Sequence, residues 1–242
     1  MTGNVGVVFV SHSSQIAAGM VQLAGQMAGS VRLVAAGGTD DDGIGTSFTK
    51  VMSAVSEADG GDGVVVISDL GSALLTAETV LDMLDEAQRS RVRVVDVPFV
   101  EGGVAAAVAA ESGGSLDEVV AAAEGAVDAW AGRSGGEPAA ASTPAAPAAE
   151  PAGAEPAGPY EREVLVRNPE GLHARPAAEF VKLANTFPVK VTVNGKDAKS
   201  LLGIMSLGLT AGSTARISSD DPDGRTAVDA LADLVDTGFG EV

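Results

Sequence analysis

A segment of 25 residues without any Val, Ile, Leu or Phe, Ser134–Gly158, most constrains what this 242-residue chain can fold into. Ten of its residues are Ala, five are Pro and four are Gly. Such a segment cannot bury apolar surface, and its prolines favour extended conformations. We therefore expect a flexible tether at residues 134–158 that joins two domains, residues 1–133 and residues 159–242.

The charge balance excludes some classes of partner. The formal net charge is −18, and residues 1–133 hold 18 acidic side chains against 6 basic ones. Nucleic acids and anionic membranes attract the opposite balance, so we expect the chain to bind neither. No apolar run reaches membrane-spanning length and the N-terminus does not resemble a secretory signal, so we expect a cytoplasmic protein.

The cysteine and histidine counts exclude several kinds of site. The chain has no cysteine, which rules out disulfides, thiol nucleophiles and cysteine-bound metal clusters. It has two histidines, His12 and His173, so a multi-histidine metal site is impossible. We expect no metal and no organic cofactor on this chain.

Short β-branched runs alternate with helical stretches in residues 1–133. This pattern predicts an α/β fold with a doubly wound, mainly parallel sheet. The predicted strands are Val5–Val10, Val31–Ala36, Gly63–Ser68 and Arg91–Val97. The predicted helices are Gln15–Ala28, Phe48–Ala58, Ala73–Ala87, Val104–Glu111 and Leu116–Trp130.

Polar loops follow the first three predicted strands, at the sheet edge where doubly wound folds bind ligands. His12 lies on the first loop and Asp69 on the third. A neutral imidazole attacks phosphorus well, and a carboxylate can hold one ring nitrogen protonated while the other reacts. Each loop precedes a helix, whose N–H groups favour an anion. The expected phosphate-binding residues are Ser13, Gly38, Thr39, Gly71 and Ser72.

Other interpretations of these loops stay open. His12 could simply be a loop or capping residue. The run Asp40–Asp42 favours a solvated loop over a metal site. The glycines of residues 37–45 match neither the dinucleotide fingerprint nor the P-loop, so nucleotide binding is unsupported.

The pattern after residue 159 predicts β-α-β-β-α-β-α, an antiparallel sheet with helices on one face. It includes a strand at Val189–Val193 that an Asn194-Gly195 hairpin turn follows. Pro176 is tolerated only in a first helical turn, which places His173 next to a helix N-terminus. A phosphoryl group is favoured there, and Arg175 could add a charged hydrogen bond. The alternative is that His173 only caps the helix and Arg175 is a surface charge. Ser200 is expected to cap the next helix.

Two segments of the second domain resemble the signatures of HPr, the histidine phosphocarrier of the phosphoenolpyruvate:sugar phosphotransferase system. They are NPEGLHARPA at residues 168–177 and KSLLGIMSLG at residues 199–208. The first domain resembles mannose-type enzyme IIA. Its segments VSHSS (10–14), GGTD (37–40), IGT (44–46) and DLGSALLTAE (69–78) are most similar to the DhaM family, the phosphotransfer subunits of phosphoenolpyruvate-dependent dihydroxyacetone kinases.

The resemblance implies a phosphohistidine relay, hence a phosphotransferase. His173, steadied by Arg175, would accept phosphate from enzyme I. His12, partnered by Asp69, would pass it to ADP on the nucleotide-binding subunit of the kinase, whose companion subunit holds dihydroxyacetone. Ser200 matches a serine that is a regulatory phosphorylation site in some HPr proteins. No enzyme-I-like segment follows the HPr-like part of the printed sequence, so we expect a separate enzyme I.

The same resemblance leaves two alternative functions. The chain could be an IIA–HPr component of a mannose-type sugar permease. It could also be a regulatory module in which phosphorylated His12 controls a regulator. Mannose-type IIA domains are commonly dimeric, so we expect a homodimer formed through the first domain.

Overall fold

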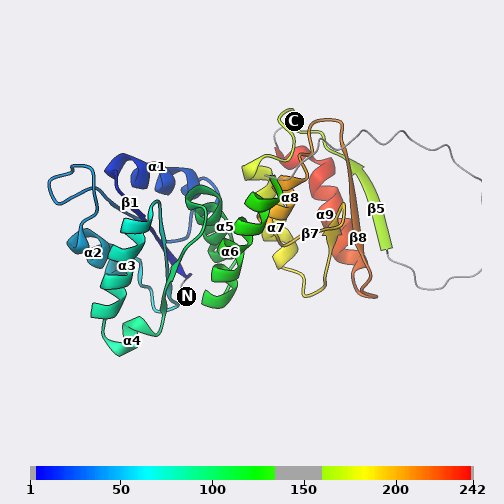
Figure 1. Cartoon of the computed structure of the whole chain (residues 1–242). Helices are drawn as coiled ribbons and strands as arrows, with labels where there is room; N and C mark the ends of the chain where they lie inside the picture. The colour runs from blue at the N-terminus through cyan, green and yellow to red at the C-terminus, as the bar shows by residue number, and fades with distance from the viewer. Residues whose placement is uncertain (1–3, 134–159, 241–242) are drawn as a thin grey trace, which may run out of the picture.

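The computed structural model describes residues 4–133 and 160–240, and in them two four-stranded sheets (Figure 1). We call β1 to α6 the N-terminal unit and β5 to the C-terminal 3₁₀ turn (η1, Gly238–Gly240) the C-terminal unit. The predicted tether at residues 134–158 lies outside the described residues, so the domain boundaries stay a prediction. Among the described residues, no helix is both long and apolar enough to cross a membrane.

The N-terminal unit is built on a parallel sheet with strand order β2-β1-β3-β4. Its strands are β1 (Gly6–Ser11), β2 (Leu33–Gly37), β3 (Val64–Ser68) and β4 (Val92–Val95). Its helices are α1 (Ser14–Gly25), α2 (Phe48–Ala58), α3 (Gly71–Met83), α4 (Glu86–Arg89), α5 (Phe99–Glu111) and α6 (Leu116–Arg133). The predicted doubly wound parallel sheet is confirmed.

Alternate residues of β1 face two different helix layers. Val7 and Phe9 pack with residues of α1, α5 and α6, whereas Val8 and Val10 pack with residues of α2 and α3. Both layers are aliphatic and rich in alanine, and the two central strands, β1 and β3, are buried on both faces. The continuous hydrophobic strands therefore form the centre of a three-layer sandwich.

Two helix predictions need correction. The helix predicted at residues 73–87 is two helices, because Asp85 ends the first stretch and accepts a hydrogen bond from Gln88 N at 2.8 Å, capping α4. The helix predicted from Val104 begins earlier, at Phe99. It includes Gly102 and Gly103, and a Cβ at Gly103 would lie 2.6 Å from Phe9 Cε1, so this glycine lets α5 press onto the sheet.

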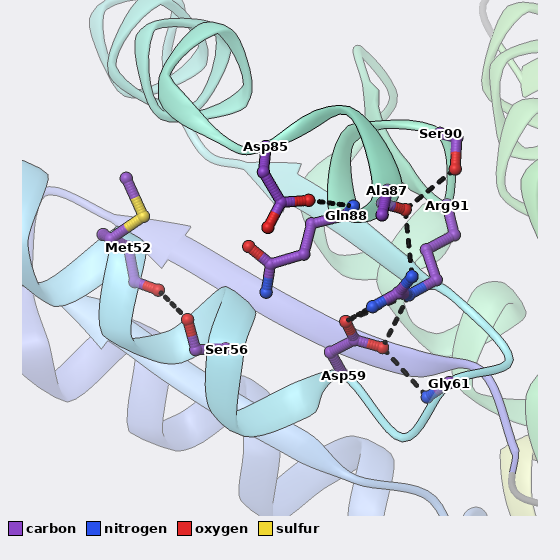
Figure 2. A network of polar contacts seen from close by, with 9 residues as sticks. All are labelled: Met52, Ser56, Asp59, Gly61, Asp85, Ala87, Gln88, Ser90 and Arg91. Carbon is purple, nitrogen blue, oxygen red and sulfur yellow. Dashed lines mark hydrogen bonds and ion pairs between the residues drawn. The ribbon is translucent and has the colours of Figure 1, made fainter.

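A polar network fastens the amino-terminal edge of this sheet (Figure 2). Asp59 follows α2 and accepts hydrogen bonds from Arg91 Nε and Nη2 and from Gly61 N. Arg91 also donates from Nη1 to the carbonyl of Ala87 at 2.9 Å. The network ties the turn before β3 to the turn before β4, at the edge opposite the loops that carry His12 and Asp69.

The C-terminal unit is an antiparallel sheet of order β5-β8-β6-β7 with helices on one face. Its elements are β5 (Tyr160–Leu165), α7 (Ala174–Asn185), β6 (Thr192–Val193), β7 (Lys196–Asp197), α8 (Leu201–Ser206), β8 (Thr214–Ser219) and α9 (Arg225–Asp236). The predicted order β-α-β-β-α-β-α is confirmed. The predicted Asn194-Gly195 turn is also present, with positive φ at both residues.

The two units touch through helices. Figure 1 shows α5 and α6 between the parallel sheet and helices α7 and α8. Leu202 of α8 packs with Ala105 of α5 and Ala126 of α6. The C-terminal unit therefore lies on the outer side of the α5–α6 layer.

Candidate functional site

His12 is the first residue after β1, the strand that lies between β2 and β3 in the parallel sheet. Asp69 is the first residue after β3, and Asp69 N donates to Val10 O at 3.1 Å. Parallel strands end at the same edge of the sheet, so the two residues are brought side by side by topology alone. This is the juxtaposition that the sequence predicts.

Two side chains hold the His12 ring, one at each nitrogen. His12 Nδ1 lies 2.9 Å from Asp69 Oδ1, and His12 Nε2 lies 2.7 Å from Ser72 Oγ, in the first turn of α3. Asp69 Oδ2 accepts from His12 N at 3.0 Å and from Ser11 Oγ at 2.8 Å. The ring keeps 20% of its surface exposed, so a partner can still reach it.

The environment of Asp69 keeps it ionised. Burial alone would raise its pKa, but hydrogen bonds from the His12 ring, His12 N–H and Ser11 outweigh burial and lower the pKa below its usual value. A carboxylate can only accept hydrogen bonds, so the proton between Asp69 and His12 lies on Nδ1. In a neutral ring, Nε2 would then carry the lone pair and could accept from the Ser72 hydroxyl. The geometry therefore favours Nε2 as the ring nitrogen that can act as a nucleophile.

The loop after β2 lies beside the site without donating to it. Gly38 N donates to Ser11 O and Thr39 N donates to Gly43 O, while the Thr39 hydroxyl accepts from Gly43 N. These groups are engaged within the loops, so the expectation that Gly38 and Thr39 bind phosphate gains no support from the geometry. Gly45 N, by contrast, donates to His12 O at 2.9 Å and fixes the loop against the histidine.

Of the remaining expected phosphate-binding residues, Ser13 is hydrogen-bonded within its own loop, whereas Gly71 and Ser72 lie next to the His12 ring. Ser13 caps α1 without a side-chain cap bond, and its N–H donates to Ser11 Oγ at 3.1 Å. Gly71 and Ser72 open α3 next to the ring. In the acidic run, Asp42 pairs with Lys50 at 2.6 Å and Asp40 accepts from the Ser47 hydroxyl. These pairs agree with the interpretation of residues 40–42 as a loop on the surface.

Sequence reasoning missed Ser11. Its hydroxyl is fully buried, donates to Asp69 and accepts from Ser13 N, so it orients the carboxylate that orients the histidine. One signal could have found it, because a serine that ends an otherwise apolar buried strand needs a polar partner inside the protein.

His173 is the N-cap residue of α7, as Pro176 in the first turn predicts. The preceding turn positions it: Gly171 has φ 71°, and a Cβ there would lie 2.3 Å from Leu209 O. His173 N donates to Gly171 O, and Ala177 N donates to His173 O. His173 is partly exposed at the amino-terminal end of a 12-residue helix.

Arg175 and Ser200 each contact a residue of their own helix. Arg175 Nε lies 3.8 Å from Glu179 Oε1, and 65% of the Arg175 side chain is exposed. Ser200 caps α8, with its hydroxyl accepting from Gly203 N at 3.1 Å, as the sequence predicts. Within the described residues, no three His, Asp or Glu side chains gather as a metal site would require.

Two family models match the chain, one on each unit. The mannose-type enzyme IIA model, described as "PTS system fructose IIA component", matches residues 6–120, and "PTS HPr component phosphorylation site" matches residues 160–237. The phosphocarrier protein HPr of Cupriavidus necator is 42% identical over 85 residues, which cover 34% of this chain and 96% of that protein. These matches agree with the fold of each unit.

Two relatives are both named DhaM, and one of them matches nearly the whole chain while the other matches about half of it. In Escherichia coli strain K12, the phosphoryl donor subunit DhaM of PEP-dependent dihydroxyacetone kinase is 34% identical, covering 98% of this chain and 51% of the relative. In Lactococcus lactis, the phosphotransferase subunit DhaM of PTS-dependent dihydroxyacetone kinase is 35% identical, covering 47% of this chain and 89% of the relative. The chain spans about half the length of the E. coli relative. With an enzyme IIA part and an HPr part in this order, the chain belongs to the DhaM family of phosphotransfer subunits.

Proposed function

We propose that this chain is a two-histidine phosphoryl relay that feeds a phosphoenolpyruvate-dependent dihydroxyacetone kinase. His173 accepts the phosphoryl group from enzyme I and passes it to His12. His12 passes it to ADP on the nucleotide-binding subunit of the kinase, whose companion subunit holds dihydroxyacetone. The observation that carries this proposal is the His12 ring fixed between Asp69 and Ser72, with Nε2 as its nucleophile.

The chemistry at His12 balances without a cofactor. The Nε2 lone pair attacks the phosphorus of phospho-His173, a new N–P bond forms, and the N–P bond to His173 breaks and returns its electron pair to that ring. Asp69 accepts the hydrogen bond from Nδ1–H, so that proton stays on the ring, and the carboxylate stabilises the positive charge that develops on the His12 ring. When an oxygen of the ADP β-phosphate attacks, the Nε2–P bond breaks and neutral His12 is restored.

Ser72 and the start of α3 suit the phosphorylated state. Ser72 Oγ lies 2.7 Å from Nε2, and in the proposed mechanism its hydroxyl donates to that nitrogen before reaction. After reaction the same hydroxyl can donate to a phosphoryl oxygen, and the amino-terminal end of α3 favours the negative charge. We assign Ser72 and Gly71 to phosphate binding, and place Ser13, Gly38 and Thr39 around them as supports of the loop.

His173 needs less machinery because it only carries the group. It lies at the amino-terminal end of α7, where the helix favours an anion. We propose that Arg175 leaves Glu179 and turns to the phosphoryl group when His173 is phosphorylated. The exposure of Arg175 allows this movement. A phosphorylated Ser200 would place charge at the start of α8 and serve regulation.

The surroundings of His12 favour a protein partner. Ile44 is 81% exposed and Leu70 is 60% exposed, and both lie on the loops that hold the histidine. Exposed apolar side chains around a reactive group are typical of a docking surface. We propose that these loops receive the nucleotide-binding subunit, that the first domain forms a homodimer, and that the relay works in the cytoplasm.

Reconstitution tests this function. Phosphoenolpyruvate, enzyme I, this protein and the two kinase subunits are combined, and dihydroxyacetone phosphate is measured. We expect product with the wild type, label at His173 alone in His12→Ala, and no label at His12 in His173→Ala.

Other outcomes would assign another role. Strong label at His12 in His173→Ala, without any other HPr, would reverse the relay order. Normal label at both histidines without product would contradict the kinase and point to a sugar permease or a regulator as the acceptor.

A further inference from the structure

Helix α5 is apolar on every side, which is unusual for a helix at the surface of a domain. Its residues 102–108 are all buried, and Glu101 and Glu111 are its acidic residues near the two ends. A helix that is hydrophobic all round needs cover on its outer side as well as its inner side. The inner side packs on Phe9 and the sheet. The outer side is covered by α6 and by the C-terminal unit.

Apolar packing and an ion pair hold the C-terminal unit there, and buried residues of both units belong to one hydrophobic cluster. Leu202 of α8 packs with Ala105 and Ala126 and is 7% exposed. At the end of α5, Lys182 Nζ lies 3.0 Å from Glu111 Oε1, and the Glu111 side chain is 11% exposed. Glu111 is fixed in turn by Ser30, whose N–H and hydroxyl donate to Oε2. Apolar packing that links buried residues of both units and one ion pair thus define the contact.

The contact is loosely filled. A cleft of about 530 Å³ remains where α5 and α6 meet α7 and α8. Polar and apolar side chains of both units line it, among them Val108 and Glu118 on one side and Val181 and Lys199 on the other. The residues opposite Leu202 are alanines, which offer little apolar surface. A contact that leaves a cleft of this size between its helices resembles a transient interface more than the interior of a domain.

The C-terminal unit lies on the face of the parallel sheet opposite to the face where α3 holds the His12 ring. The His12 ring is held by Ser72 of α3, and α3 covers the sheet face that carries Val8 and Val10. The C-terminal unit packs outside α5, which covers the opposite face. The sheet and the α5 layer, each roughly 10 Å thick, therefore separate α7 from the reacting side of His12. Direct transfer needs the reacting atoms within about 3.5 Å of each other.

We infer that the contact of α7 and α8 with α5 and α6 is a docked resting state, and that transfer from His173 to His12 requires the C-terminal unit to leave this surface. The surface on α5 and α6 is thus a binding site for the chain's own phosphocarrier unit. The inference rests on the proposed relay and adds a step to it. The resting contact keeps the phosphocarrier close while it is charged, and the departure from α5 precedes delivery.

A reversible lock tests the inference in the full chain. The chain has no cysteine, so Ala126→Cys with Leu202→Cys can form only one intramolecular disulfide. We expect the oxidised protein to label His12 from its own phospho-His173 at least tenfold more slowly than the reduced protein, with the rate restored by reductant. As a control, added full-length His12→Ala protein should still label His12 of the oxidised chain, because that histidine stays exposed.

An opening variant tests the same inference from the other side. Leu202→Glu places a charge where the leucine packs against α5 and α6. Leu165→Glu is its matched control on β5, where the leucine is already 55% exposed. We expect Leu202→Glu to transfer from His173 to His12 at least as fast as wild type, and Leu165→Glu to equal wild type.

Three results would overturn the inference. One is undiminished His12 label in the oxidised chain. Another is a tenfold slower transfer in Leu202→Glu with normal His173 label, which would make the contact the productive complex. The third is that the disulfide does not form and that zero-length cross-linking yields no amide bond between Lys182 and Glu111. Both failures together would exclude the contact in solution. If the reduced chain never labels His12, the relay itself is contradicted instead.

Discussion

The two nitrogens of the His12 ring have different partners, and in the proposed relay that difference decides which of them reacts. Asp69 Oδ1 lies 2.9 Å from Nδ1, where a carboxylate can only accept, and Ser72 Oγ lies 2.7 Å from Nε2, where a hydroxyl can donate. Ser11 sets the carboxylate in place from the end of β1. The sequence predicts that His12 and Asp69 meet, because both follow neighbouring strands. It does not predict the nucleophilic nitrogen, which depends on the first turn of α3 and on a buried hydroxyl.

Asp69→Asn should slow transfer through His12 by at least about tenfold, and by up to about 10⁴-fold. An amide can donate to Nδ1, which moves the ring proton to Nε2 and removes the lone pair that attacks phosphorus. The measurement is single-turnover transfer from phospho-His173 to His12. Asp59→Asn is the matched control. Asp59 also accepts a hydrogen bond from a side-chain nitrogen, that of Arg91, but it lies at the opposite edge of the sheet. Equal rates in Asp69→Asn and wild type would reduce Asp69 to a structural residue.

At the scale of helices and strands, the sequence predicts most of the order because hydrophobic periodicity and turn residues are local. The parallel strands, the Asn194-Gly195 turn and the position of His173 before α7 all follow from such signals. The errors arise where a local signal competes with periodicity. Asp85 interrupts an apolar pattern that continues through it, and Gly102 and Gly103 hide the start of α5. The shortened strand at Thr192–Val193 reflects pairing with β8, which is not local.

The Asp59–Arg91 ion pair connects the turns before β3 and β4, and its contribution to the free energy of unfolding should depend on pH. The Asp59 pKa is lowered chiefly by the hydrogen bonds from Arg91, against the effect of burial. A carboxyl group whose pKa is depressed by folding stabilises the fold above its unfolded pKa, near 3.8, and loses that stabilisation as the pH falls through the lower folded value.

We therefore expect Asp59→Asn to lower the free energy of unfolding by roughly 1–3 kcal/mol at neutral pH, the range for a buried charged hydrogen bond. The difference from wild type should shrink as the pH falls below about 3.8, where Asp59 of the unfolded chain takes up a proton, and it should be lost once the pH has fallen through the lower pKa of folded Asp59. Urea unfolding followed by circular dichroism at several pH values measures it. A difference that stays constant down to pH 3 would mean that shape, and not charge, is what the asparagine changes.

At the scale of the whole molecule, the contact between the two units could not be predicted from separate signatures. Each signature describes one unit, whereas the contact depends on the outer side of α5 and on Leu202 of α8. One local hint exists in the sequence of α5, whose run of small apolar residues has no polar side. That hint says that the helix is covered and does not say by what.

The last prediction concerns the segment that joins the two units. The sequence predicts that residues 134–158 act as a tether, and two partners joined by a short flexible tether experience an effective concentration of about millimolar. Transfer from His173 to His12 within one chain should therefore have a rate that does not change when the protein is diluted through the micromolar range. In a mixture of His12→Ala and His173→Ala chains, transfer has to cross between chains. Between separate molecules its rate should fall in proportion to dilution, whereas within a mixed dimer of the proposed kind it should not. The measurement is the initial rate of His12 labelling at several protein concentrations. If the mixed chains at about 1 µM match the intact chain, transfer between chains is as fast as transfer within one, and the covalent connection contributes nothing to delivery.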